Sequence, residues 1–211
     1  MNVSHIHWYG HDSFRIEDGA TQVYIDPWKM PEGLPRADVV LVTHSHYDHY
    51  SAADVNRLST PETTVVGPAD VAEKVRSETG AVALPIAAGQ TVEIESLRVT
   101  AVAAYNVNKK FHPKASGWVG YVVRLSDGTS IYHAGDTDCI PEMKGLAVDV
   151  ALLPVSGTYV MTGDEAARAA EAIGAKVVIP MHYGDIVGTD ADAATLKKTF
   201  KGLTVIKPQE G

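Results

Sequence analysis

The stretch Asp38–His49 reads DVVLVTHSHYDH, and it decides both the fold and the chemistry of this chain. Its DVVLVT segment is a continuous apolar run of the kind that forms a strand buried on both faces. Three imidazoles and a carboxylate follow within six residues, at His44, His46, Asp48 and His49. Binding sites of α/β proteins gather beyond the carboxyl ends of strands. The stretch therefore predicts a metal-binding loop rather than a polar surface loop with chance histidines.

The spacing within this loop indicates two metal positions. His44 and His46 are two residues apart on extended chain, so their side chains point to one side and can hold one metal ion. Asp48 and His49 come from the following turn and can hold a second ion. Imidazole nitrogens together with carboxylate oxygens suit Zn²⁺, Mn²⁺ or Fe²⁺.

Two later segments place further ligand types directly after predicted strands. Asp136 follows His133 in the sequence HAGDT, where Gly135 allows a tight turn. His182 lies in the sequence PMHYG, after another apolar run. In both segments a potential ligand therefore lies just past a strand end, where the sites of α/β proteins gather.

The rest of the chain alternates short strands with helices, which predicts a layered α/β fold with sheet in the middle. The pattern alone leaves the topology open. Strands are predicted over 5–9, 13–17, 22–25, 38–43, 63–67, 91–94, 97–103, 117–125, 129–133, 148–153 and 177–180, and helices over 52–58, 69–78, 163–173 and 191–200.

Composition narrows the classes of function. The chain has 211 residues, one cysteine and a formal net charge of −8. An acidic balance argues against non-specific binding to nucleic acid or to an anionic membrane. No apolar run approaches the roughly 20 residues of a membrane span, and no signal peptide is recognisable. We therefore expect a cytoplasmic protein with a small-molecule substrate, with no nucleic-acid or membrane partner; a homo-oligomer stays open.

Taken together, the motifs resemble those of the metallo-β-lactamase superfamily. They are H-x-H-x-D-H at 44–49, G-D-T at 135–137 and P-x-H-Y at 180–183. The opening W-Y-G-H-D-S-F and I-D-P-W resemble the branch that contains L-ascorbate 6-phosphate lactonase and many uncharacterised metal-dependent hydrolases. The resemblance covers nearly the whole chain. It implies a single domain over 1–211, folded as a four-layer αββα sandwich with a two-metal site at one edge of the sheets.

The resemblance also implies which residues bind the two divalent ions, of which Zn²⁺ is the expected species and Mn²⁺ or Fe²⁺ the alternatives. It assigns His44 and His46 to the first ion, Asp48, His49 and His182 to the second, and Asp136 to a bridge between them.

One departure from the superfamily concerns the third histidine of the first ion. The corresponding stretch, 102–108, contains no histidine, and the next one is His112. Three alternatives stay open: His112 loops back to the ion, Asn106 lends an amide oxygen, or the site has no third protein ligand. We expect His112 to lie near the site, over the metals beside Lys110 or Lys114, and to contact the substrate.

Several residues have two interpretations each. His133 either donates a proton to the leaving group or fixes the turn at Gly135, and Tyr183 is a further proton donor or a packing residue. Asp26 is expected to accept an N–H from a metal-binding imidazole. His11 lies beside the metals or in a hydrogen-bonded turn. The lysines around His112 either attract the substrate or belong to a solvated loop, and the loop is the preferred interpretation. Cys139 is expected to be a small buried residue.

The expected chemistry is hydrolysis. Two cations lower the pKa of a shared water, and the resulting hydroxide attacks an ester, lactone or phosphoester; Asp48, His112 and His133 are the candidate catalytic side chains. Redox enzymes of this fold carry a glutamate at the position of His46, and nucleases add a domain for the polynucleotide. The alternative that stays open is a non-catalytic or regulatory metal-binding protein of the same fold.

Overall fold

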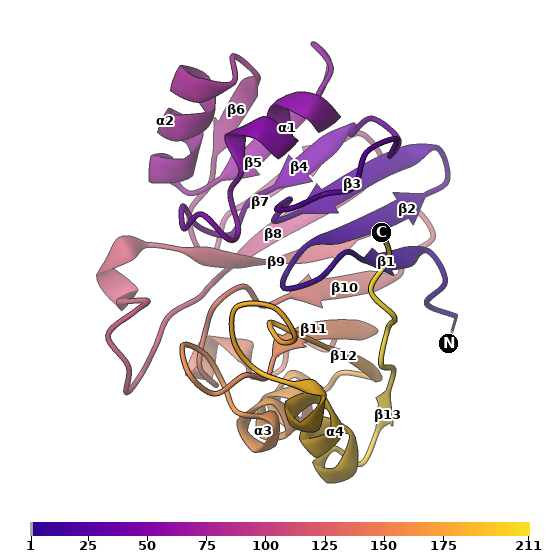
Figure 1. Cartoon of the computed structure of the whole chain (residues 1–211), viewed down its shortest axis with the longest axis vertical. Helices are drawn as coiled ribbons and strands as arrows, with labels where there is room; N and C mark the ends of the chain where they lie inside the picture. The colour runs from indigo at the N-terminus through magenta and orange to yellow at the C-terminus, as the bar shows by residue number, and fades with distance from the viewer. Residues whose placement is uncertain (1) are drawn as a thin grey trace.

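The computed structural model describes residues 2–211, which form two sheets packed face to face with helices on the outside (Figure 1). The first sheet has the strand order β1-β2-β3-β4-β5-β6. Pairing is antiparallel from β1 to β3 and parallel from β3 to β6. The strands are β1 (Ile6–Trp8), β2 (Phe14–Asp18), β3 (Thr21–Ile25), β4 (Val39–Leu41), β5 (Thr64–Gly67) and β6 (Val82–Pro85).

The second sheet has the order β13-β12-β11-β10-β9-β8-β7. Pairing is antiparallel from β7 to β10 and parallel from β10 to β13. The strands are β7 (Thr91–Ile94), β8 (Leu97–Ala103), β9 (Val119–Arg124), β10 (Ser130–His133), β11 (Val150–Pro154), β12 (Val177–Met181) and β13 (Leu203–Thr204).

Helices α1 (Ala52–Leu58) and α2 (Ala69–Glu78) cover the first sheet, and α3 (Gly163–Ile173) and α4 (Asp190–Thr199) cover the second (Figure 1). Short 3₁₀ turns, η1 (Lys114–Ser116) and η2 (Pro141–Met143), lie in the connections of the second half. A continuous apolar core fills the space between the sheets, and a smaller core lies under α1 and α2. The predicted αββα sandwich is thus confirmed.

Local sequence explains where the elements begin and end. Ser51 Oγ accepts the Asp54 N–H at the start of α1, and a capping box between Thr162 and Glu165 starts α3. Gly174 ends α3 in the left-handed conformation. Every residue of β4, β11 and β12 is buried, as continuous apolar runs predict. The sequence did not predict β6 and β13, which are an edge strand with partly exposed side chains and a two-residue strand.

This topology brings loops from both sheets to one edge of the sandwich. The loops after β4, β8, β10 and β12 meet there with the turn between β1 and β2. Within residues 2–211, no helix combines the length and apolar character that crossing a membrane would require.

Candidate metal centre

The loop after β4 is anchored by the buried carboxylate of Asp26. Thr43 N–H donates to Asp26 Oδ1 (2.7 Å), and the Thr43 hydroxyl donates to Asp26 Oδ2 (2.6 Å). His49 Nδ1 lies 2.7 Å from the same Asp26 Oδ2. Asp26 therefore fixes the loop at its first residue and at its last histidine, as the sequence analysis expected for an N–H acceptor.

His44, His46 and His112 form the first group of potential ligands, because one nitrogen from each lies within 4.8 Å of the others. His44 Nε2 and His46 Nδ1 are 3.1 Å apart. Asn106 Oδ1 accepts the backbone N–H of His112 (3.0 Å) and lies 3.2 Å from its Nδ1. Of the two candidates for the third ligand, the structure therefore brings His112 to the group, while Asn106 orients it.

A second group contains His11, Asp48, His49 and His182, whose ligand atoms also lie within 4.8 Å of one another. His11 Nε2 is 3.3 Å from Asp48 Oδ2. The His11 ring lies against the His182 ring, with centroids 4.1 Å apart.

The carboxylate of Asp136 lies between the two groups. Its Oδ2 is 3.0 Å from His112 Nε2 and 3.3 Å from His182 Nε2. Its Oδ1 is 3.4 Å from His49 Nε2. A single side chain thus faces both groups, which is the arrangement needed to bridge two ions.

Outer contacts fix four of the histidine rings through their Nδ1 atoms. Besides the contacts of His49 and His112, Thr43 Oγ1 lies 3.0 Å from His44 Nδ1, and Ser156 Oγ lies 2.9 Å from His182 Nδ1. Such contacts set the ring orientation and leave Nε2 as the free nitrogen. In all four rings this Nε2 atom faces the cluster.

Burial and neighbouring charges lower the pKa of two histidines of the site and raise the pKa of two others. Burial, aided by the neighbouring imidazoles, holds the pKa of His44 well below the usual value, and it also lowers the pKa of His46. Burial acts in the same direction on His49 and His182, but nearby carboxylates outweigh it. Asp136 and Asp26 raise the pKa of His49 well above normal, and Asp136 and Asp12 raise the pKa of His182 to about 9.

Two carboxylates of the site, those of Asp136 and Asp48, have lowered pKa values despite burial. Burial would raise the pKa of Asp136, yet His182 and His49 hold it well below the usual value. The pKa of Asp48 is lowered in the same way, by contact with His11 and by the charge of His49, which together exceed the effect of burial.

Buried polar atoms without hydrogen-bond partners test whether the site suits metal ions. Among the described residues, seven such atoms occur in this one cluster. Buried polar groups are normally paired, so this many unpaired atoms facing one another indicate a site built for cations. The atoms are Nδ1 and Nε2 of His11, both carboxylate oxygens of Asp12, Nε2 of His49, Oδ1 of Asp136 and Nε2 of His182.

Three residues of the site adopt left-handed backbone conformations. The φ angles are 48° at His11, 49° at Asp26 and 59° at His182. Non-glycine residues adopt such angles only where the surrounding structure holds them, commonly at functional sites. Backbone hydrogen bonds provide that hold: Trp8 Nε1–H and His182 N–H both donate to the His11 carbonyl, at 2.9 and 3.0 Å.

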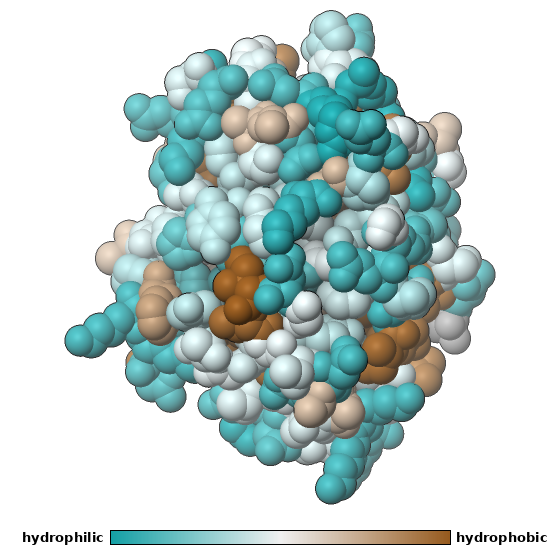
Figure 2. Space-filling model, in the orientation of Figure 1, coloured by the Kyte–Doolittle hydropathy of each residue, from teal (hydrophilic) through white to brown (hydrophobic). Residues whose placement is uncertain are grey.

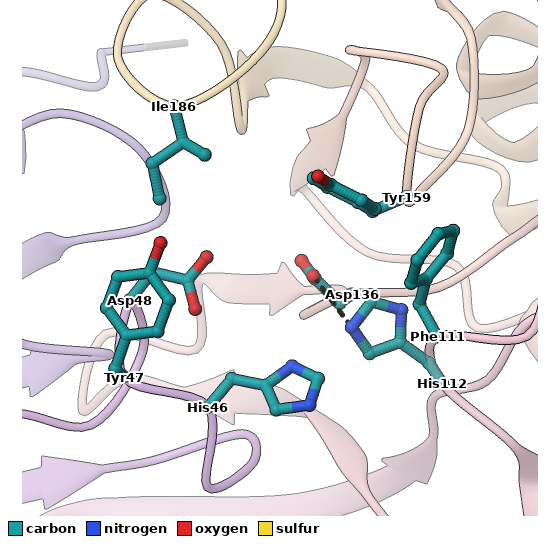
Figure 3. A pocket seen from close by; sticks show the side chains of 8 residues that line it. All are labelled: His46, Tyr47, Asp48, Phe111, His112, Asp136, Tyr159 and Ile186. Atoms are coloured by element: carbon teal, nitrogen blue, oxygen red, sulfur yellow. Dashed lines mark ion pairs between the residues drawn. The ribbon is translucent and has the colours of Figure 1, made fainter.

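A pocket of about 230 Å³ opens onto the cluster (Figure 3). His46, Asp48, His112 and Asp136 form its polar part. Its remaining walls are Tyr47, Phe111, Tyr159 and Ile186, and the rings of Phe111 and Tyr159 pack edge to face at 4.6 Å. The molecular face in Figure 2 is largely hydrophilic, and one of its few apolar areas lies over the loop between β12 and α4.

Several candidates from the sequence lie elsewhere. His133 is fully buried. Its Nε2–H donates to the Asp12 carbonyl (2.9 Å), and its Nδ1 accepts the Gly135 N–H (3.2 Å). His133 therefore fixes the turn, and neither ring nitrogen is free to donate a proton to a leaving group. Tyr183 is buried and stacks on Trp8, with ring centroids 5.0 Å apart, which agrees with its interpretation as a packing residue. Cys139 is half-buried and belongs to neither ligand group.

Two of the lysines near His112 are engaged outside the pocket. Lys109 pairs with Asp138 (2.6 Å), and Lys114 pairs with Glu142 (2.8 Å). His112 faces Asp136 and lines the pocket, while Lys114 is bound to another carboxylate, so substrate contact by His112 beside Lys110 or Lys114 stays a prediction.

Sequence reasoning missed one acidic residue of the centre. Asp12 is fully buried, and its carboxylate lies with His49, Asp136 and His182 within 4.8 Å. In the sequence it stands out only as part of the W-Y-G-H-D-S-F motif. Its position next to His11, in a turn between two strands, was the only available hint.

This fold and this cluster together define a metal-dependent hydrolase of the metallo-β-lactamase type. A family model described as "Beta-lactamase superfamily domain" matches residues 5–182, and the chain belongs to that superfamily. Within it, the chain belongs with proteins described as UPF0173 metal-dependent hydrolases. One from Nitratidesulfovibrio vulgaris is 35% identical over 195 residues, covering 85% of this chain and 80% of the relative. Another, from Methanoregula boonei, is 37% identical over 211 residues, covering 95% and 91%.

Solved structures agree with the fold. A candidate metal-dependent hydrolase of Parabacteroides distasonis superposes with a TM-score of 0.84 at 29% identity, covering 97% of this chain and 93% of that chain. Igni18, a metallo hydrolase of Ignicoccus hospitalis, superposes with a TM-score of 0.79 at 22% identity, covering 97% and 95%, and supports the fold alone.

Proposed function

We propose that this protein is a two-metal hydrolase that cleaves a small ester or lactone carrying an apolar group. The observation that carries the proposal is the position of Asp136, which faces both ligand groups at the polar end of a pocket with aromatic and aliphatic walls. The proposed partner is a small molecule, because a pocket of about 230 Å³ fits a compact substrate.

The pocket walls favour a carbonyl substrate over a phosphoester. None of the eight described side chains that line the pocket is a lysine or an arginine. The nearby Lys109 and Lys114 are paired with Asp138 and Glu142. A phosphoester would therefore depend on the metal ions alone for charge neutralisation, whereas a neutral ester matches the apolar walls.

The ligand groups define where the ions would lie. In our assignment, Asp136 would be a ligand of both ions, because its carboxylate faces histidines of both groups. Two bound divalent ions lower the pKa of a coordinated water and polarise a carbonyl oxygen. His44, His46 and His112 would hold the first ion, and Asp48, His49 and His182 the second.

The protein's own contribution is to orient these ligands and to position the substrate. Asp26, Asn106 and Ser156 fix imidazole rings through hydrogen-bonding contacts, which reduces the reorganisation needed during reaction. Figure 3 shows the Tyr159 hydroxyl directed into the pocket, so we propose that it contacts the leaving group. Phe111 packs against Tyr159 and holds that ring in place.

The test is metal analysis followed by activity profiling. Protein purified without added metal would be depleted with chelator, reconstituted with Zn²⁺, Mn²⁺ or Fe²⁺, and assayed on matched esters, lactones and phosphodiesters with aliphatic or aromatic groups. We expect about two ions per chain, and hydrolysis of esters or lactones that chelation abolishes. Two bound ions without turnover on any substrate would favour the alternative, a metal-binding protein without catalysis.

A further inference from the structure

The turn between β1 and β2 carries two buried polar residues that the assigned ligand sets leave unused. Ser13 N–H donates to the Gly10 carbonyl and closes the turn at 2.9 Å. Inside it, His11 is 1% exposed and Asp12 is 0% exposed. Hydrogen bonds from Trp8, His182 and His133 to the two backbone carbonyls hold this turn in place.

The Asp12 carboxylate has no hydrogen bond within the described part of the chain, from residue 2 to residue 211. Three imidazole nitrogens lie near its Oδ2: His49 Nε2 at 3.4 Å, His11 Nε2 at 3.8 Å and His182 Nε2 at 3.9 Å. An oxygen of the Asp136 carboxylate also lies within 4.8 Å of the Asp12 carboxylate. A buried carboxylate is costly unless a cation or hydrogen bonds compensate it. These separations are those of atoms arranged around a common centre rather than bonded to each other, because ligands about 2.1 Å from one ion lie about 3.0–3.4 Å apart or more.

Two overlapping ligand sets share His49 and His182. One adds His11 and Asp48, and the other adds Asp12 and Asp136. An ion between the two shared histidines would therefore be surrounded by three imidazoles and three carboxylates. The first position, by contrast, is formed by His44, His46 and His112, and Asp136 Oδ2 lies 3.0 Å from His112 Nε2.

We propose that Asp12 is an additional ligand of the second ion and that the resulting shell of up to six ligand atoms, half of them carboxylate oxygens, favours Mn²⁺ or Fe²⁺. Zinc is satisfied by about four ligands in tetrahedral geometry, whereas octahedral, carboxylate-rich sites suit manganese and non-haem iron. Asp12 therefore raises the affinity for manganese relative to zinc. This inference rests on the proposed two-metal function, and it makes the two positions chemically different.

The experiment compares metal affinities of the chelator-treated protein. Mn²⁺ and Zn²⁺ are each titrated calorimetrically into wild type, Asp12→Asn and Asp18→Asn, with metal content measured by mass spectrometry. Asp18 is the matched control: it is also buried, but its carboxylate is hydrogen-bonded to Ser96 and Ser126 away from the centre. We expect Asp12→Asn to weaken Mn²⁺ binding at one position by about 10- to 100-fold or more and Zn²⁺ binding by clearly less, with the control unchanged.

Equal losses for both metals would assign Asp12 a structural role, and unchanged affinities would exclude it from the centre; either result overturns the inference. A crystal structure of the wild-type protein soaked with Mn²⁺ measures the distance from Asp12 to the ion directly, and this test does not require any variant to fold. Asp12 Oδ2 should lie about 2.2 Å from the second ion, and a carboxylate beyond about 3 Å would refute its role as a ligand. Wild type that binds no metal would instead refute the proposed function, so the two failures are distinguishable.

Discussion

Lowering the pH should release one ion well before the other, because the two ligand groups hold different numbers of protons before metal binds. Asp136 and Asp26 raise the pKa of His49 well above its usual value, and the pKa of His182 is raised to about 9 despite burial. Both imidazoles are therefore protonated at pH 7 in the metal-free protein. The pKa of Asp136 is held well below normal, so this carboxylate carries no proton there.

The size of the effect follows from the count of displaced protons. A metal ion at the second position must displace the protons of both His49 and His182, because a ligand imidazole is neutral. Each displaced proton changes the apparent affinity about tenfold per pH unit, so two protons give about 100-fold per unit between pH 6 and 8. At the first position burial lowers the pKa of His44 and of His46, so a metal ion there displaces fewer protons from these two imidazoles than from His49 and His182.

Isothermal titration calorimetry in buffers of different ionisation enthalpy measures the number of protons released. We expect about two protons for the second ion and fewer for the first, with affinity at the second position falling steeply as the pH is lowered. Equal proton release at both positions, or a pH-independent affinity at the second, would refute the assignment of protons to His49 and His182.

The remaining predictions concern variants. Asp136→Ala should abolish activity and weaken the binding of at least one ion while circular dichroism stays native, because the core is large enough to stand without this side chain. A fully active variant would contradict the bridging role of Asp136. His112→Ala should lower metal occupancy as well as turnover. Asn106→Ala should weaken metal binding about 10- to 100-fold, because it removes the contact that orients His112. Unchanged metal content in both variants would exclude His112 as a ligand. Tyr159→Phe should reduce turnover with metal content unchanged, as kinetics and metal analysis on one preparation would show. Leu41→Ala should lower the free energy of unfolding by about 2–5 kcal/mol, because Leu41 is fully buried between strands, and urea denaturation tests this.

Local sequence patterns determined most of the fold. The apolar run before His44 became β4, all of whose residues are buried, and the segments around Asp136 and His182 follow strands as predicted. Ser51 and Gly174 mark helix ends by hydrogen bonding and by backbone conformation, both of which depend only on neighbouring residues. These elements were predictable because short-range physics specifies them.

Only the tertiary structure decided which distant side chains meet. It brought His112 rather than Asn106 to the first ligand group, engaged both nitrogens of His133 with backbone groups, and placed Asp12 in the centre. These outcomes depend on how two sheets stack and on where separate loops end, which no local pattern encodes. Hydrophobic burial selects that stacking without regard to the polar side chains at its edge, so the composition of the metal centre follows from the fold as a whole.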